Sequence, residues 1–179
     1  KWSYDLGVVY EGFENIWKRT GDATYFKTMQ KSMDSYLGKD GTINNYKQSD
    51  FNIDNVKNGR TLLMLYKVTG QQKYFKAATL LWDQLQQQPR TKEGGFWHKK
   101  IYPNQMWLDG LYMGQPFYAE YATLIKNDKA FDDIAGGKTI DAAPFRRYES
   151  WAGCNISPGL AKYANNQIQL DQKSNATCL

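Results

Sequence analysis

The chain repeats itself at an offset of 49 residues, and this repeat is the feature that most limits its fold. Residues 17–27 match residues 66–76, with Lys, Thr, Gly, Tyr, Phe and Lys identical in register. A period of roughly 20 to 50 residues is typical of one supersecondary unit stacked several times. The repeat therefore predicts an array of similar units along the chain.

Each copy of the repeat has the pattern of a helical hairpin. A first apolar segment ends at Thr-Gly, where Gly21 and Gly70 suit the left-handed turn that closes a helix. The second segment then shows apolar residues at helical spacing in both copies. These residues are Tyr25, Met29, Met33 and Tyr36, and then Tyr74, Ala77, Ala78, Leu81 and Leu85. We expect helices over residues 5–20, 23–37, 54–69 and 72–87.

A third hairpin follows the first two. Residues 106–125 are again long and apolar, and residues 129–134 suit the start of a partner helix. Pro116 is expected to kink this fifth helix or to end its first part. The pattern predicts an all-α domain of three helical hairpins over residues 1–135, with no sheet of more than two short strands. Residues 136–179 lack this pattern, and we leave them as an unplaced tail.

Three hairpins expose a large inner face that six hairpins could close into a ring, so we expect the chain to form part of a larger helical toroid. The chain starts at Lys1 without Met or an apolar leader, which suggests a missing preceding segment and leaves localisation open. Cys154 and Cys178 allow at most one disulfide.

Composition excludes two classes of partner. The net charge is +5, from 23 Lys and Arg against 18 Asp and Glu, but the basic residues are scattered along the chain. Such a diffuse charge does not predict a nucleic-acid surface, and no apolar run is long enough to span a membrane. We therefore expect no nucleic acid and no membrane, and the oligomeric state is left open.

Residues 89–113 hold the densest set of side chains suited to catalysis. The pair Gly94-Gly95 permits backbone conformations closed to other residues and brings Trp97, His98 and Lys99 into one turn. A ring and a cation beside an acid suit an anionic sugar. Trp2, Trp97 and Trp107 flank the expected helix starts and are the candidate walls of such a site.

Asp109 is the candidate proton donor. Its neighbours along the chain are mostly apolar, namely Met106, Trp107, Leu108, Leu111 and Met113. An apolar setting removes water from a carboxyl and favours its neutral form, as a general acid requires.

Asp54 is a second candidate carboxylate, at the expected start of a helix. An aspartate there also suits the helix dipole without any further role. However, the repeat superposes Asp5 on Asp54, and equivalent helix starts in a ring of hairpins point to one end. We therefore expect Asp5, Asp54 and Asp109 at the same end of the bundle. Asp54 lies in a polar stretch and is expected to be ionised.

His98 is the only histidine in the chain. A zinc site needs several ligands of the His and Cys type, which this sequence does not supply near His98. We therefore predict no metal and no cofactor.

Five stretches of the chain resemble the unsaturated rhamnogalacturonyl hydrolases of glycoside hydrolase family 105, which is related to the family 88 unsaturated glucuronyl hydrolases. These stretches are residues 52–60, 66–74, 89–91, 94–99 and 105–113. The resemblance covers about residues 2–134 and implies part of an (α/α)6 barrel. It also implies an unsaturated oligosaccharide partner, from whose nonreducing end an unsaturated galacturonic acid is released.

The resemblance also implies roles for individual residues. Asp109 would protonate the C4=C5 enol ether and help water to add at C5, after which the hemiketal collapses, and Asp54 would assist. The substrate-binding candidates are His98, Lys99, Trp107, Met113, Tyr4 and Arg60.

Two other classes remain open from the sequence. A helical-repeat interaction scaffold would explain the repeat without catalysis. A noncatalytic sugar-binding relic of the same barrel would explain the tail, which does not match the family. Convergence of the acidic and aromatic residues of 94–113 in one cleft would argue against the scaffold.

Overall fold

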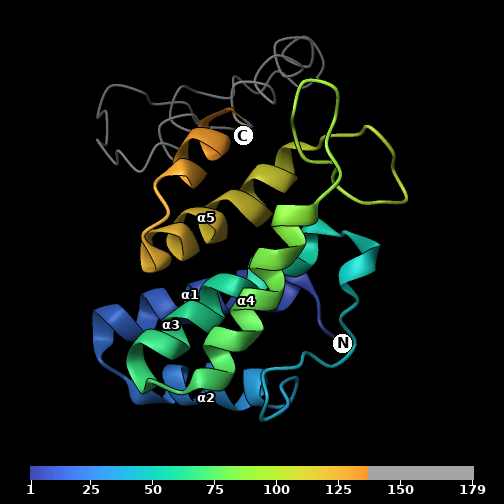
Figure 1. The fold of residues 1–179 in the computed structure, drawn as a ribbon. Coiled ribbons are helices and arrows are strands. Elements are labelled where there is room, and N and C mark those ends of the chain that lie inside the picture. Colours follow the sequence, from blue (N-terminus) through green and yellow to red (C-terminus); the bar gives the residue numbers. More distant parts are fainter. Residues whose placement is uncertain (137–179) are drawn as a thin grey trace, which may run out of the picture.

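The computed structural model describes residues 1–136, which fold into helices and connecting loops (Figure 1). Five α-helices carry the architecture: α1 (Tyr4–Thr20), α2 (Ala23–Asp34), α3 (Gly59–Thr69), α4 (Gln72–Gln87) and α5 (Leu108–Ile125). Two short 3₁₀ helices precede α3: η1 (Gln48–Asp50) and η2 (Ile53–Asn58). Residues 129–136 are also helical. Within residues 1–136 the only β-pairing consists of two isolated bridges, so the all-α prediction is confirmed.

The sequence repeat is a repeat of structure. Gly21 and Gly70 both end their helices in the left-handed conformation, with φ of 73° and 69°. The N–H of Gly21 donates to the carbonyl of Trp17, and that of Gly70 to the carbonyl of Tyr66, each at 2.8 Å. These shared closing bonds fix the turn in each hairpin, which is why Gly stands at both positions.

Ring contacts also repeat between the hairpins. Trp17 packs on Phe26 with ring centroids 4.9 Å apart, and Tyr66 packs on Phe75 at 5.1 Å. Each pair joins the end of the first helix to the start of the second. The first two hairpins are therefore closed by the same contacts.

Three expectations at helix ends need correction. The helix expected over residues 54–69 begins as η2, where the Asn52 side chain accepts the N–H of Asp54. Helix α2 ends at Asp34, earlier than expected. Pro116 does not end the fifth helix, because α5 runs through it. Pro116 has no N–H group and cannot donate a helical hydrogen bond. The buried side chains of Met113, before it, and Phe117, after it, hold α5 in place.

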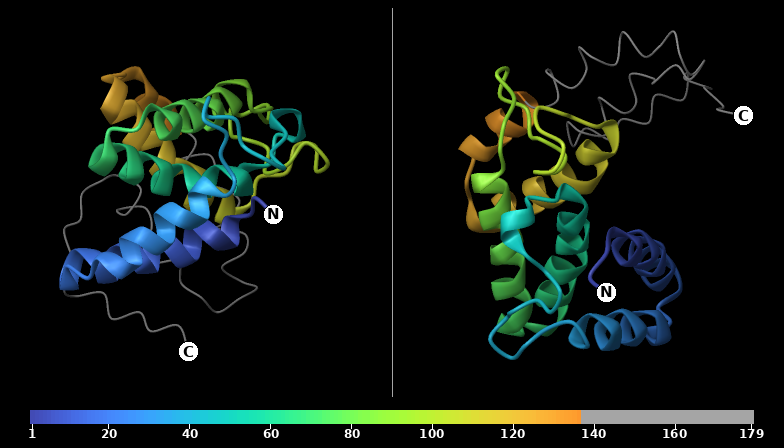
Figure 2. Two further views of the ribbon diagram at one scale, coloured as in Figure 1. Left: turned by 90° about the horizontal axis from the view of Figure 1, so that it is seen from below. Right: turned by 90° about the vertical axis from the view of Figure 1, so that its right-hand side faces the viewer.

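The hairpin of α3 and α4 lies between the hairpin of α1 and α2 on one side and α5 on the other (Figure 2). Close packing brings the start of α3 against α5. A Cβ atom on Gly59 would lie 2.3 Å from the ring of Phe117, so only glycine fits at this contact. Helix η2 and the beginning of α3 therefore pack against α5.

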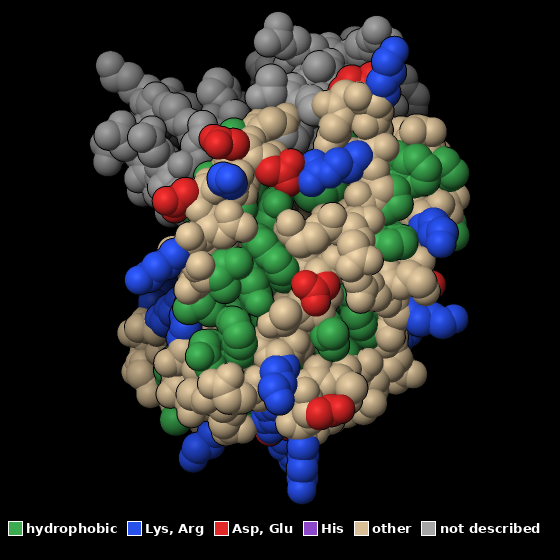
Figure 3. All heavy atoms as spheres, in the orientation of Figure 1, with side chains coloured by type: hydrophobic (Ala, Val, Ile, Leu, Met, Phe, Trp, Pro, Cys, Tyr) green, Lys and Arg blue, Asp and Glu red, His purple; other side chains and the backbone are tan. Residues whose placement is uncertain are grey.

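Aromatic side chains fill the space between α4 and α5. Trp82 stacks on Tyr121 with centroids 4.7 Å apart, and Phe75 stacks on the same tyrosine at 5.7 Å. Figure 3 shows apolar side chains gathered over this region of the surface. None of the helices in residues 1–136 has both the length and the apolar character that a membrane span requires.

Candidate active site

The loop between α4 and α5 joins the two segments that carry the candidate acids. The carbonyl of His98 accepts the N–H of Ile53 at 3.0 Å, next to Asp54 in η2. The N–H of His98 donates to the carbonyl of Gln105 at 2.7 Å, shortly before α5 begins. The backbone of one residue therefore connects η2 with the approach to α5.

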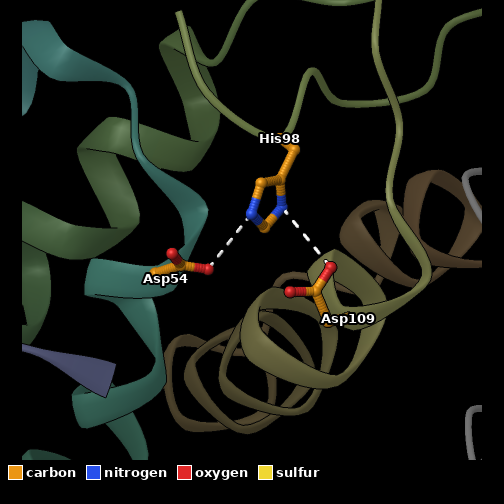
Figure 4. Close-up of side chains that lie close together, drawn as sticks. All are labelled: Asp54, His98 and Asp109. Carbon is orange, nitrogen blue, oxygen red and sulfur yellow. Dashed lines mark ion pairs between the residues drawn. The ribbon is translucent and has the colours of Figure 1, made fainter. Parts of the chain in front are cut away.

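The side chain of His98 lies between the two carboxylates (Figure 4). Its Nε2 is 3.2 Å from Oδ1 of Asp54, and its Nδ1 is 3.9 Å from Oδ1 of Asp109. The contact with Asp54 is within ion-pair distance but lacks the alignment of a hydrogen bond. The expectation that Asp54 and Asp109 reach one place at the same end of the bundle is confirmed.

Asp5 lies at that end as well. It stands in the first turn of α1, which begins beside η2. The indole of Trp2 donates to the carbonyl of Asn55, and the amide of Asn58 donates to the carbonyl of Ser3. These bonds place the start of α1 against the segment that carries Asp54, as the repeat predicts.

Asp54 is the buried acid of the pair, with a side chain 11% exposed. Its Oδ2 lies 2.7 Å from Nζ of Lys99. Burial alone would raise the pKa of Asp54, but the contacts and positive charges of His98 and Lys99 outweigh burial and lower this pKa below its usual value. The prediction that Asp54 is ionised is confirmed in direction, although the cause is this pairing rather than its polar neighbours in sequence.

The expected apolar enclosure of Asp109 is wrong for this structure. Its side chain is 50% exposed, whereas that of His98 beside it is only 1% exposed. Asp109 lies in the first turn of α5, where its apolar sequence neighbours Leu108 and Leu111 occupy other directions around the helix. Apolar neighbours in sequence therefore do not enclose a side chain that points outward.

The remaining candidates divide into two groups. Trp107 stacks on the imidazole of His98, Lys99 pairs with Asp54, and Met113 is 7% exposed in α5, one turn after Asp109. Tyr4 and Arg60 do not join the cluster.

Tyr4 is 41% exposed and, within residues 1–136, makes no hydrogen bond or ring contact with Asp54, His98 or Asp109. Arg60 is paired with two acids, at 2.7 Å from Glu11 and 3.4 Å from Glu120. Its charge is therefore neutralised away from the cluster.

Sequence reasoning missed Gln88, which holds the loop that carries His98. Gln88 is 3% exposed, and its Nε2 donates to the carbonyls of Phe51 at 2.7 Å and Trp97 at 2.8 Å. The residue is the last of three consecutive glutamines, of which the first two end α4. Nothing in that run distinguishes the buried glutamine from its exposed neighbours.

Asp54, His98 and Asp109 also form the one group in the described part of the chain whose atoms are close enough to hold a metal ion, within 4.8 Å of one another. The arrangement suits proton sharing better. Each imidazole nitrogen faces a different carboxylate, and Lys99 already occupies one oxygen of Asp54.

Comparisons with known proteins identify the family of the chain and support its fold. The sequence model of Glycosyl Hydrolase Family 88 matches residues 1–140, so the chain belongs to this family. The unsaturated rhamnogalacturonyl hydrolase YesR of Bacillus subtilis (strain 168) is 28% identical over 138 residues, which make up 74% of this chain and 38% of that protein.

A solved structure gives the same result for the fold. The glycoside hydrolase from family 105 of C. acetobutylicum ATCC 824 matches with a TM-score of 0.76 and 46% sequence identity. The match covers 78% of this chain and 39% of that one. The resemblance to family 105 is confirmed, and the hairpins form part of an (α/α)6 barrel. The chain spans about two fifths of the length of these relatives.

Proposed function

We propose that the protein is a glycosidase that releases an unsaturated galacturonic acid from the nonreducing end of pectin or rhamnogalacturonan fragments, by hydration of the C4=C5 double bond. The observation that carries this proposal is the placement of Asp54 and Asp109 on either side of His98. The family membership and the rhamnogalacturonyl hydrolase among the relatives support the substrate class.

Asp54 and Asp109 have different roles in the proposed reaction because their surroundings differ. Lys99 and His98 keep Asp54 ionised, so Asp54 is unsuited to donate a proton near neutral pH. Among residues 1–136 no lysine pairs with Asp109, and its side chain faces solvent, where the sugar would lie. Asp109 gives its proton to C4 of the bound sugar, and the carboxylate left behind accepts the proton released when water adds its hydroxyl group at C5. The hemiketal formed at C5 then collapses, and the bond to the rest of the oligosaccharide breaks.

The cations of the site suit the charge of the substrate. Lys99 is 23% exposed beside Asp54 and can turn toward the carboxylate of a uronic acid. His98 lies between the acids and limits their mutual repulsion when it is protonated. Met113 would shape the sugar site next to them.

We also propose that the chain consists of two parts with different roles. Residues 1–135 would supply the part of the barrel that carries the acids, and residues 136–179 would form a separate tail. Residues 137–179, which include Cys154 and Cys178, lie outside the described residues.

Convergence of the loop residues argues against a pure interaction scaffold, since His98, Lys99, Trp107 and Asp109 meet in one cluster. A sugar-binding relic is separated from an enzyme by turnover.

The test is an ultraviolet assay of the conjugated double bond, which the proposed hydration of C4=C5 removes. The purified chain and the full-length gene product are each given rhamnogalacturonan fragments produced by a lyase. We expect the full-length product to consume the chromophore and to leave saturated fragments unchanged. Binding of the unsaturated fragments without turnover would support the relic and reject the enzyme.

A further inference from the structure

Three aromatic rings of one loop form a stack next to the acids. The imidazole of His98 lies parallel to the indole of Trp107, with centroids 4.4 Å apart and planes 10° from parallel. The phenol ring of Tyr102 stacks on the same indole, at 5.1 Å and 18°. The indole N–H donates to Oε1 of Gln105 at 3.1 Å. The loop itself therefore fixes the plane of the indole.

The imidazole depends on this stack for its orientation. Its Nε2 lies 3.2 Å from Asp54 without hydrogen-bond alignment, and its Nδ1 lies 3.9 Å from Asp109, beyond hydrogen-bond distance. An imidazole is usually oriented by such bonds. In this site the flat contact with Trp107 restrains the ring plane, and the backbone of Gly110 lies close beside Nδ1.

We propose that Trp107 is a positioning residue, whose indole, supported by Tyr102, keeps the imidazole of His98 between the two carboxylates. This inference rests on the proposed function, because it takes the cluster of Asp54, His98 and Asp109 as the reacting site. It differs from the role of sugar wall expected for Trp107, since part of the flat surface of the indole is covered by His98 and Tyr102.

The two roles predict different kinetics. A misplacement of about 1 Å in a reacting group can lower the rate about 10²-fold. We therefore expect Trp107→Leu to lower kcat by about 10- to 100-fold with little change in KM. Trp107→Phe keeps a ring and should retain most of kcat. Loss of a sugar wall would instead raise KM and leave kcat largely intact.

Tyr102→Leu is the second variant, because it removes only the outer ring of the stack. A stacked aromatic pair changes an equilibrium constant by a factor of about 2 to 13. We expect kcat of Tyr102→Leu to fall by about the same factor. Phe131→Leu is the matched control, since it removes a ring that is 36% exposed on another helix and should change neither constant.

Nuclear magnetic resonance tests the position of the imidazole without any activity. His98 is the only histidine in this chain, so its ring signals need no assignment by mutation. A Cβ on Gly110 would lie 3.3 Å from Nδ1 of His98, which places the ring beside the α-protons of Gly110. We expect a nuclear Overhauser effect between them in the wild type, in Trp107→Phe and in Phe131→Leu.

In Trp107→Leu, and partly in Tyr102→Leu, this effect should weaken while circular dichroism stays unchanged. An effect of wild-type strength in both variants would overturn the proposal, as would a Trp107→Leu enzyme with raised KM and normal kcat. Absence of turnover in the wild-type full-length product would reject the proposed function alone, because the resonance experiment still decides whether Trp107 positions His98.

Discussion

Replacement of Lys99 by methionine tests the charge arrangement around Asp54. Nζ of Lys99 lies 2.7 Å from Oδ2 of Asp54, and the two side chains are 23% and 11% exposed. Loss of one partner costs about 0–1 kcal/mol for an exposed pair and about 3–5 kcal/mol for a buried one. This pair lies between those limits, so we expect Lys99→Met to lower the free energy of unfolding by about 1–3 kcal/mol at pH 7.

The loss of stability caused by Lys99→Met should decrease as the pH falls. The pKa of Asp54 is lowered in the folded protein, so its ionised form contributes stability above the usual value of 3.8. This contribution is lost as the pH falls through the lower pKa of the folded state. The difference in free energy of unfolding between wild type and Lys99→Met should therefore be largest at pH 7 and should decrease as the pH falls below 3.8.

Urea unfolding followed by circular dichroism measures both effects, with Lys100→Met as the control. Lys100 is the next residue along the chain and is exposed, so its replacement should cost less than about 0.5 kcal/mol. The pairing of Lys99 with Asp54 would be refuted if the two variants lost the same free energy of unfolding. It would also be refuted if the loss in Lys99→Met were the same at neutral and acid pH.

Two further substitutions, with Gly12→Ala as a control for the first, test how the fold positions the site. Gly59→Ala should destabilise the protein by about 1–3 kcal/mol, because its Cβ would lie 2.3 Å from the ring of Phe117. Gly12→Ala in α1 meets no atom within 4 Å and should instead stabilise it by up to about 1 kcal/mol; the two thermal midpoints should move in opposite directions. Gln88→Leu leaves the carbonyls of Phe51 and Trp97 without their donor and should cost about 1–3 kcal/mol in urea unfolding. A neutral result would show that water replaces the amide.

The hairpins could be predicted because their signals are local. Gly21 and Gly70 end helices by bonds within a single turn, and the apolar spacing after them lies on one helix face. The offset of 49 residues relates Asp5 to Asp54, and the equivalence of helix starts in successive hairpins correctly placed Asp54 and Asp109 at one end.

The surroundings of each acid could not be predicted in the same way. Asp54 takes its charge partners from a loop more than 40 residues away, as His98 and Lys99 show. The exposure of Asp109 depends on its direction from α5, which the identity of its sequence neighbours does not give. Arg60 adjoins the motif around Asp54, yet its partners Glu11 and Glu120 come from two other helices. Contacts between elements decide these features.

The central claim is that Asp109 donates the proton, and turnover of the Asp109→Asn variant of the full-length gene product tests it most directly. The amide keeps the shape of the side chain but has no proton to transfer. We expect a rate lower by about 10²- to 10⁴-fold with substrate binding largely intact, whereas Asp128→Asn, an exposed aspartate after α5, should retain wild-type turnover. Wild-type turnover by Asp109→Asn, with its circular dichroism spectrum unchanged, would contradict the account.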